Sequence, residues 1–73
     1  MRLARAFGIN VRRRRKELGF TQEALSDAVK LAVTYVGQIE RGQRNPTLEV
    51  IERFARALKV DALDLLKPAE PTK

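Results

Sequence analysis

The chain has 73 residues, and its 15 Lys and Arg against 9 Asp and Glu give a formal net charge of +6 at pH 7. A chain of this length is expected to form one small domain, whose thin core leaves room for stabilisation by a partner chain. Cysteine and histidine are both absent. This composition excludes disulfides, zinc sites with the usual ligands, and catalysis by a Cys nucleophile or a His base. We therefore expect a non-enzymatic protein with no metal and no cofactor.

The positive charge is concentrated at the start of the chain. Residues 1–16 hold seven cations and no acid, whereas residues 17–73 hold eight cations and nine acids. Such a start is also typical of an organelle transit peptide, but this segment lacks serine and runs directly into a helical pattern. The longest apolar run has three residues, which predicts neither a secretory signal nor a membrane-spanning helix. We therefore expect a cytoplasmic protein.

Three helices are predicted in the first part of the chain. Apolar residues at helical spacing indicate a first helix that ends before Gly19. Thr21 offers a hydroxyl N-cap for a second helix over about 21–29. A break at residues 30–31 separates it from a third helix over 32–41.

Two further helices are predicted after a loop rich in turn residues. Thr47 caps a fourth helix, whose apolar residues also recur at helical spacing. Asp61 and Asp64 resemble a capping box that opens a short fifth helix. The sequence therefore predicts an all-α, compact five-helix domain over 1–67, followed by a flexible tail over 68–73.

Three short motifs follow one another through the middle of the chain. Residues 21–25 read TQEAL, residues 35–42 read YVGQIERG, and residues 45–48 read NPTL. In this order and spacing they resemble the Cro/lambda-repressor-like helix-turn-helix family, also called the xenobiotic-response-element family, over residues 7–66. Within that family the chain looks most like the controller proteins of restriction–modification systems. The resemblance implies a lambda-repressor-like DNA-binding domain that regulates transcription, of repressor type. Repression would come from occupying promoter DNA, and activation by contacting polymerase is equally open to the family.

One side of the predicted third helix is free of core residues. Positions 33, 34, 37, 38 and 41 face away from its apolar side, and a recognition helix uses such positions to contact base edges in the major groove. The resemblance adds contacts with phosphates or groove edges from the start of the second helix, from the third helix and from the loop after it. The candidate DNA-binding residues are Thr21, Gln22, Val33, Thr34, Tyr35, Gly37, Gln38, Arg41, Arg44 and Asn45.

The third helix is unusual in having Val33 and Gly37 among its reading positions. Neither side chain can hydrogen-bond a base, so we expect thymine methyls to contact Val33 and the Thr34 methyl, and backbone to approach closely at Gly37. Polar readout would come from Thr34, Gln38 and Arg44, with Arg44 reading guanine. Without the family motifs, Thr34 and Gln38 would be interpreted as solvated helix surface.

Other positions also have two interpretations. Tyr35 would either donate to a phosphate or pack at the rim of the interface. The cations at 12, 13, 14 and 16 belong either to a solvated helix face or to a surface that attracts DNA at long range. For Arg14, we expect the stem to pack while the guanidinium reaches solvent.

The turn between the second and third helices departs from the family pattern. Lys30 stands where the family often has glycine, and Ala32 stands where it has a capping residue. A left-handed lysine and an uncapped helix both cost stability. We therefore expect a loose or shifted turn.

Arg15 is predicted to point into the core. It lies four residues after Val11 and three before Leu18, so its guanidinium requires a carboxylate partner. The resemblance implies that this partner is Glu40 of the third helix. We predict a structural salt bridge between the first and third helices.

The end of the chain has more apolar residues than one short helix needs for its own core. We predict a dimer interface formed by Val60, Leu63, Leu65 and Leu66. A homodimer suits a two-fold operator, whose half-sites lie about 34 Å apart. The predicted partners are double-stranded DNA and a second copy of the chain, with no membrane and no small-molecule ligand, in the nucleoid of a prokaryote or a phage-infected cell.

Two alternatives come from other functional classes. The same fold serves as a protein–protein or antitoxin-type module, which would bind DNA weakly. Binding of RNA or membrane through the basic first helix is disfavoured, because no aromatic residue is interleaved with the arginines for base stacking.

Overall fold

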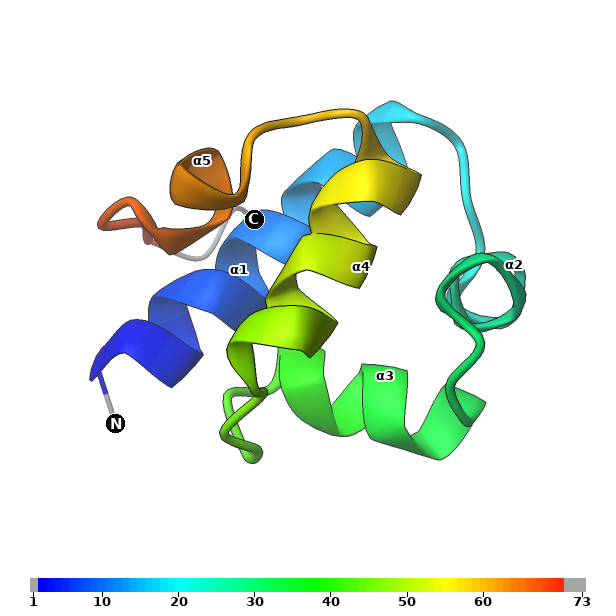
Figure 1. The fold of residues 1–73 in the computed structure, drawn as a ribbon, viewed down its shortest axis with the longest axis horizontal. Coiled ribbons are helices and arrows are strands. Elements are labelled where there is room, and N and C mark those ends of the chain that lie inside the picture. Colours follow the sequence, from blue (N-terminus) through cyan, green and yellow to red (C-terminus); the bar gives the residue numbers. More distant parts are fainter. Residues whose placement is uncertain (1, 71–73) are drawn as a thin grey trace.

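The computed structural model describes residues 2–70 as five α-helices joined by short loops (Figure 1). The helices are α1 (Arg2–Glu17), α2 (Gln22–Val29), α3 (Val33–Glu40), α4 (Leu48–Leu58) and α5 (Ala62–Leu66). The prediction of an all-α, five-helix fold is confirmed. Residues 68–70 follow α5 without helical structure, and the rest of the predicted tail, 71–73, lies outside the described residues. Within 2–70, none of the helices combines the length and apolar character that a membrane crossing requires.

A single apolar core joins the helices. α1 packs against α3, α4 and α5, while α2 packs against α3 and α4. Figure 1 shows α1 and α4 side by side, with α3 running across below them and α2 at one side. The rings of Phe7 and Phe54 meet edge to face at the centre of the core, with 5.5 Å between their centroids. This arrangement leaves α3 at the edge of the molecule.

Two threonines begin helices as predicted. The Oγ1 of Thr21 accepts a hydrogen bond from the Ala24 N–H at 3.0 Å, and that of Thr47 accepts one from the Val50 N–H at 3.1 Å. Each bond satisfies a first-turn N–H that has no partner within its helix. Both predicted N-caps are confirmed.

The predicted capping box at the start of α5 is wrong. Asp61 makes no side-chain hydrogen bond to the first turn, and the Asp64 carboxylate instead contacts the Nζ of Lys67 at 2.8 Å. The hydrogen bond and the charge of Lys67 lower the pKa of Asp64 below its ordinary value. The Asp64 carboxylate therefore binds the Lys67 cation, three residues later, instead of the backbone N–H that a capping box would use.

The turn between α2 and α3 is well formed, contrary to the expectation of a loose turn. Lys30 is left-handed, with φ 59° and ψ 46°, and the Leu31 N–H donates to the Ser26 carbonyl at 3.0 Å. This pattern is that of a Schellman motif, which satisfies the last carbonyls of α2. The lysine adopts the conformation at a cost of roughly 1–2 kcal/mol. Ala32 begins α3 without a side-chain cap, as predicted.

Gly8 allows α1 and α3 to approach closely. A Cβ at this position would lie 2.2 Å from the carbonyl oxygen of Ile39 and 2.9 Å from that of Glu40. Backbone atoms cannot move aside as a flexible side chain can, so only glycine fits this contact. Gly8 thus sets how closely the C-terminal end of α3 packs on α1.

Candidate nucleic-acid interface

α3 is packed on one side and open on the other. Val36 and Ile39 are buried in the core, whereas Thr34 and Arg41 are exposed and Val33 is 40% exposed. In Figure 1 no other helix lies beyond the outer side of α3. The N-terminal end of α3 is therefore accessible to a large ligand.

Gly37 does not present bare backbone on this open side. A Cβ at Gly37 would lie 3.3 Å from the Nη1 of Arg41 and 3.8 Å from the Oε1 of Gln22. Gly37 is buried, and the neighbouring Gln38 is half-buried. Gly37 thus makes room for two side chains of the predicted interface instead of leaving its own backbone uncovered.

Arg15 and Glu40 form a buried ion pair, with 2.7 Å between Nε and Oε2. The Nη2 of Arg15 donates to Oε1 of Glu40 at 3.1 Å, and its Nη1 donates to the carbonyl of Phe20 at 2.9 Å. The two side chains are only 11% and 3% exposed, in that order. The pair therefore ties α1 to the C-terminal end of α3.

The start of α2 is connected to the same carboxylate. Gln22 donates from Nε2 to the Oε1 of Glu40 at 3.0 Å, which directs its own Oε1 toward Gly37. The neighbouring Thr21 is exposed, and its hydroxyl oxygen is the N-cap acceptor, so its hydroxyl proton is left to donate to a phosphate. The bond between Gln22 and Glu40 is not predictable from the linear pattern, because 18 residues separate its ends.

The loop after α3 places Arg44 over the ring of Tyr35, with 5.1 Å between Cζ and the ring centroid. Tyr35 is half-buried against the core, and Arg44 is exposed. Asn45 is exposed as well and lines an apolar hollow together with Pro46. Arg44 and Tyr35 therefore adjoin the reading positions of α3, whereas Asn45 lies at the border of another surface.

Only part of the arginine run in α1 faces solvent. Arg12 and Lys16 are exposed. Arg14, by contrast, donates from Nε to the carbonyl of Leu58 at 2.9 Å and contacts Glu17 at 3.3 Å. The Arg14 side chain is 31% exposed and its contact with Glu17 lies at the surface. The stem therefore packs and the guanidinium reaches solvent as expected, while its Nε also binds a carbonyl at the end of α4.

The four predicted dimer residues have different environments. Leu63 is 74% exposed, Val60 and Leu66 are half-buried, and Leu65 is 2% exposed. Leu65 belongs to the core of one chain, so its assignment to a dimer face is wrong. α5 has five residues, little more than one turn, and its periodicity is too short to distinguish the inward leucine from the outward ones.

A further apolar surface adjoins α5. Leu3 is 60% exposed and Leu48 is 78% exposed, and both line a hollow of about 240 Å³ that Leu66 also lines. The hollow joins the starts of α1 and α4 to the end of α5. The exposed leucines therefore form an apolar surface around this hollow.

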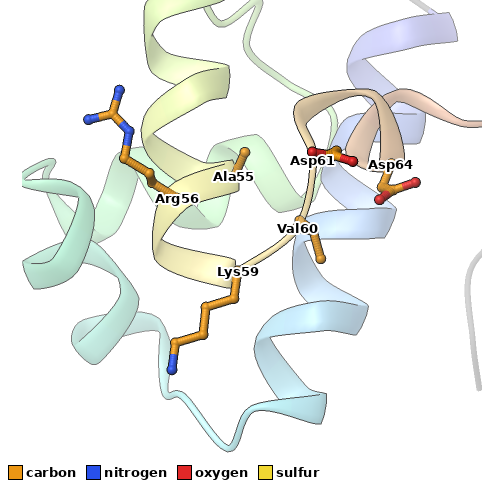
Figure 2. A pocket seen from close by; sticks show the side chains of 6 residues that line it. All are labelled: Ala55, Arg56, Lys59, Val60, Asp61 and Asp64. Carbon is orange, nitrogen blue, oxygen red and sulfur yellow. The ribbon is translucent and has the colours of Figure 1, made fainter.

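A second hollow lies where α4 meets α5 (Figure 2). Arg56 and Lys59 extend from the end of α4, and Asp61 with Asp64 stands on the α5 side. Figure 2 shows these side chains pointing away from one another, so they do not converge on a ligand. Across residues 2–70, no group of three or more acidic side chains is arranged to hold a metal ion.

Known proteins resemble the chain along most of its length. The profile of the family described as Helix-turn-helix matches residues 11–65. The uncharacterized HTH-type transcriptional regulator y4dJ of Sinorhizobium fredii is 35% identical over 99% of this chain and 94% of its own length. Control protein C.BamHI of Bacillus amyloliquefaciens is 43% identical over 82% of this chain and 75% of its own.

A solved structure shows the same arrangement of helices. The restriction-modification controller protein C.AhdI from Aeromonas hydrophila superposes with a TM-score of 0.81 and is 39% identical, covering 85% of this chain and 94% of its own. The chain thus belongs to the Cro/lambda-repressor-like helix-turn-helix family of DNA-binding transcriptional regulators.

Proposed function

We propose that the protein binds operator DNA as a symmetric homodimer, with α3 of each copy in the major groove of one half-site. The two-sided character of α3 carries this proposal. Val36 is buried, while Val33 and Thr34 are exposed at the N-terminal end. The cations Arg41, at the C-terminal end, and Arg44, in the following loop, are exposed as well. A recognition helix needs short side chains at its N-terminal end and cations that meet the flanking phosphates. A dimer bound at a promoter would repress transcription by excluding polymerase in the cytoplasm of a prokaryotic or phage-infected cell.

The proposed contacts with DNA are of two kinds, those that read the bases and those that position the protein on the phosphate backbone. Thymine methyls would meet Val33 and the methyl of Thr34, and polar readout would come from the Thr34 hydroxyl and from Gln38. The start of α2 would hold a phosphate through its free backbone N–H groups, assisted by Thr21 and Gln22. Arg41 and Arg44 would contact the duplex from the end of α3 and the loop after it, whereas Asn45 borders the hollow beside α5.

Selection of bound sites from random duplex DNA, followed by titration at several salt concentrations, tests the proposal. We expect a palindromic site and a logarithm of affinity that falls linearly with the logarithm of salt, by about 0.9 for each phosphate contact. Promoters of restriction–modification genes are the first natural targets to test, since C.AhdI is a controller protein of such a system. Weak binding with little salt dependence would contradict DNA regulation and favour a protein–protein module.

Three changes test the reading side of α3. Thr34→Ala and Gln38→Ala should each weaken operator binding by roughly 1–3 kcal/mol while leaving non-specific binding unchanged. Replacing operator thymines by uracil should cost on the order of 1 kcal/mol at one or two positions, through lost contact with Val33 and Thr34. Operator affinity that is unchanged in all three experiments would contradict the placement of α3 in the major groove.

The dimer surface we propose combines Val60, Leu63 and Leu66 with the neighbouring Leu3 and Leu48. Leu63→Asp adds a charge to this surface without touching the core, because Leu63 is 74% exposed. In sedimentation experiments we expect this variant to be monomeric and correctly folded. It should bind a single half-site as the unaltered chain does and lose the added affinity for the full palindrome. If the variant remained dimeric, the assignment of the dimer interface to this surface would be wrong.

A further inference from the structure

The contact between Tyr35 and Arg44 joins the recognition helix to the loop after it. The Cζ of Arg44 lies 5.1 Å from the centroid of the Tyr35 ring, within the range of a cation–π interaction. Tyr35 is half-buried and packs on the core, which fixes the ring. Arg44 is exposed, and within residues 2–70 its guanidinium forms no ion pair with a carboxylate.

A guanidinium that rests on an aromatic face keeps its N–H donors free. Those donors lie in the guanidinium plane and point outward from its edge, where they match two adjacent acceptors. The ring also limits the conformations of a long, exposed side chain before any ligand arrives. Less conformational freedom is then lost on binding.

We propose that Tyr35 is a positioning residue, and that its ring, not its hydroxyl, contributes to DNA recognition by holding Arg44 for bidentate donation to a guanine of the operator. The proposal rests on the DNA-binding function proposed above and adds how the arginine expected to read guanine is held in place. Guanine presents O6 and N7 side by side in the major groove, and arginine is its commonest partner. A tyrosine that donated to phosphate would use its hydroxyl instead, so the two roles make opposite predictions for phenylalanine.

Binding of the selected operator by the full chain tests the role of the ring. Tyr35→Phe should bind as the unaltered chain does, whereas Tyr35→Leu should weaken binding about fivefold. Arg44→Ala should weaken it by about tenfold or more, and adding Tyr35→Leu to Arg44→Ala should cost nothing further. Arg56→Ala is the matched control, because it removes one exposed cation from the end of α4, away from α3.

The identity of the base is tested with 7-deazaguanine, which lacks the N7 acceptor. At one operator position this replacement should weaken binding of the unaltered chain and leave Arg44→Ala unaffected. No loss at any position would overturn the assignment to guanine. A loss in Tyr35→Phe as large as in Tyr35→Leu would overturn the ring as the functional part of Tyr35.

A measurement without DNA separates this inference from the proposed function. Ring currents should shift the Arg44 side-chain protons upfield in NMR spectra of the unaltered chain and of Tyr35→Phe, and the shift should disappear in Tyr35→Leu. Circular dichroism shows whether each variant is folded. If the chain binds its operator with steep salt dependence but the Arg44 protons are unshifted, the ring contact fails while the DNA-binding function stands.

Discussion

Replacing Glu40 with alanine removes the carboxylate that both Arg15 and Gln22 contact. Arg15 would keep only its hydrogen bond to the carbonyl of Phe20, although its side chain is 11% exposed and therefore largely shielded from water. Breaking one side of a buried ion pair costs roughly 3–5 kcal/mol. Because Arg15 retains one hydrogen bond and some contact with water, we expect the lower end, about 3 kcal/mol. For a chain of this length, the melting temperature would fall by roughly 12–24 °C.

Urea unfolding followed by circular dichroism measures this loss, with an unchanged slope showing that the folded state is still compact. Glu17→Ala is the matched control. It removes a glutamate that pairs with Arg14 at 3.3 Å, but the Glu17 side chain is 55% exposed, so the cost should stay below about 1 kcal/mol. Equal losses in the Glu40 and Glu17 variants would refute the reasoning from burial.

The double variant Arg15→Met with Glu40→Leu separates folding from recognition. Apolar side chains of similar size often replace a buried ion pair without loss of stability. Gln22 would nevertheless lose its partner on α3, so we expect stability to recover while operator affinity does not. Operator affinity that returned together with stability would show that Glu40 serves the fold alone.

Further changes test local features of the fold. Gly8→Ala places a Cβ against backbone carbonyls of α3 and should cost about 1–3 kcal/mol or more in urea unfolding; an unchanged midpoint would contradict the close contact. Lys30→Gly removes the strain of a left-handed lysine and should stabilise the fold by up to about 1 kcal/mol. Arg12→Gly, at an exposed position inside α1, should destabilise it by a similar amount, and free-energy changes of the same sign in both variants would refute this explanation. Lys67 lowers the pKa of Asp64, so the contribution of this pair is complete above the pKa of the unfolded carboxyl and is lost as pH falls through the folded value. Lys67→Gln should raise the pKa of Asp64 toward its ordinary value in an NMR titration, and an unmoved pKa would contradict the pairing.

The helices were predictable because their signals are local. The starts of α2 and α4 are each marked by a threonine just before the helix, whose hydroxyl oxygen accepts a hydrogen bond from the N–H three residues later. Apolar residues at a period of 3.6 identify the buried sides of α3 and α4. The ion pair between Arg15 and Glu40 required the family resemblance as well, because the sequence shows only that Arg15 points inward and needs some carboxylate.

Contacts between distant residues were not predictable. Asn10 is 2% exposed and donates from Nδ2 to the carbonyls of Leu65 and Lys67, 55 and 57 residues away, which closes the end of α5 onto α1. An asparagine inside an arginine-rich helix gives no local indication of that role. The hydrogen bond from the Arg14 Nε to the carbonyl of Leu58 also joins residues far apart in the sequence. In each case the end of one helix meets the side of another, and only the packed fold determines where that happens.

The residues that hold α3 in place and those that would read DNA lie at different parts of this two-turn helix. Gly8 and the Arg15–Glu40 pair fix its C-terminal end against α1, and buried Val36 anchors its middle. Val33 and Thr34 are exposed at the other end and take no part in these contacts. Substitutions at 33 and 34 should therefore change the preferred operator with little change in the free energy of unfolding, whereas substitutions at 8, 15 or 40 should change both. This separation explains how one scaffold can be kept while its DNA sequence preference changes.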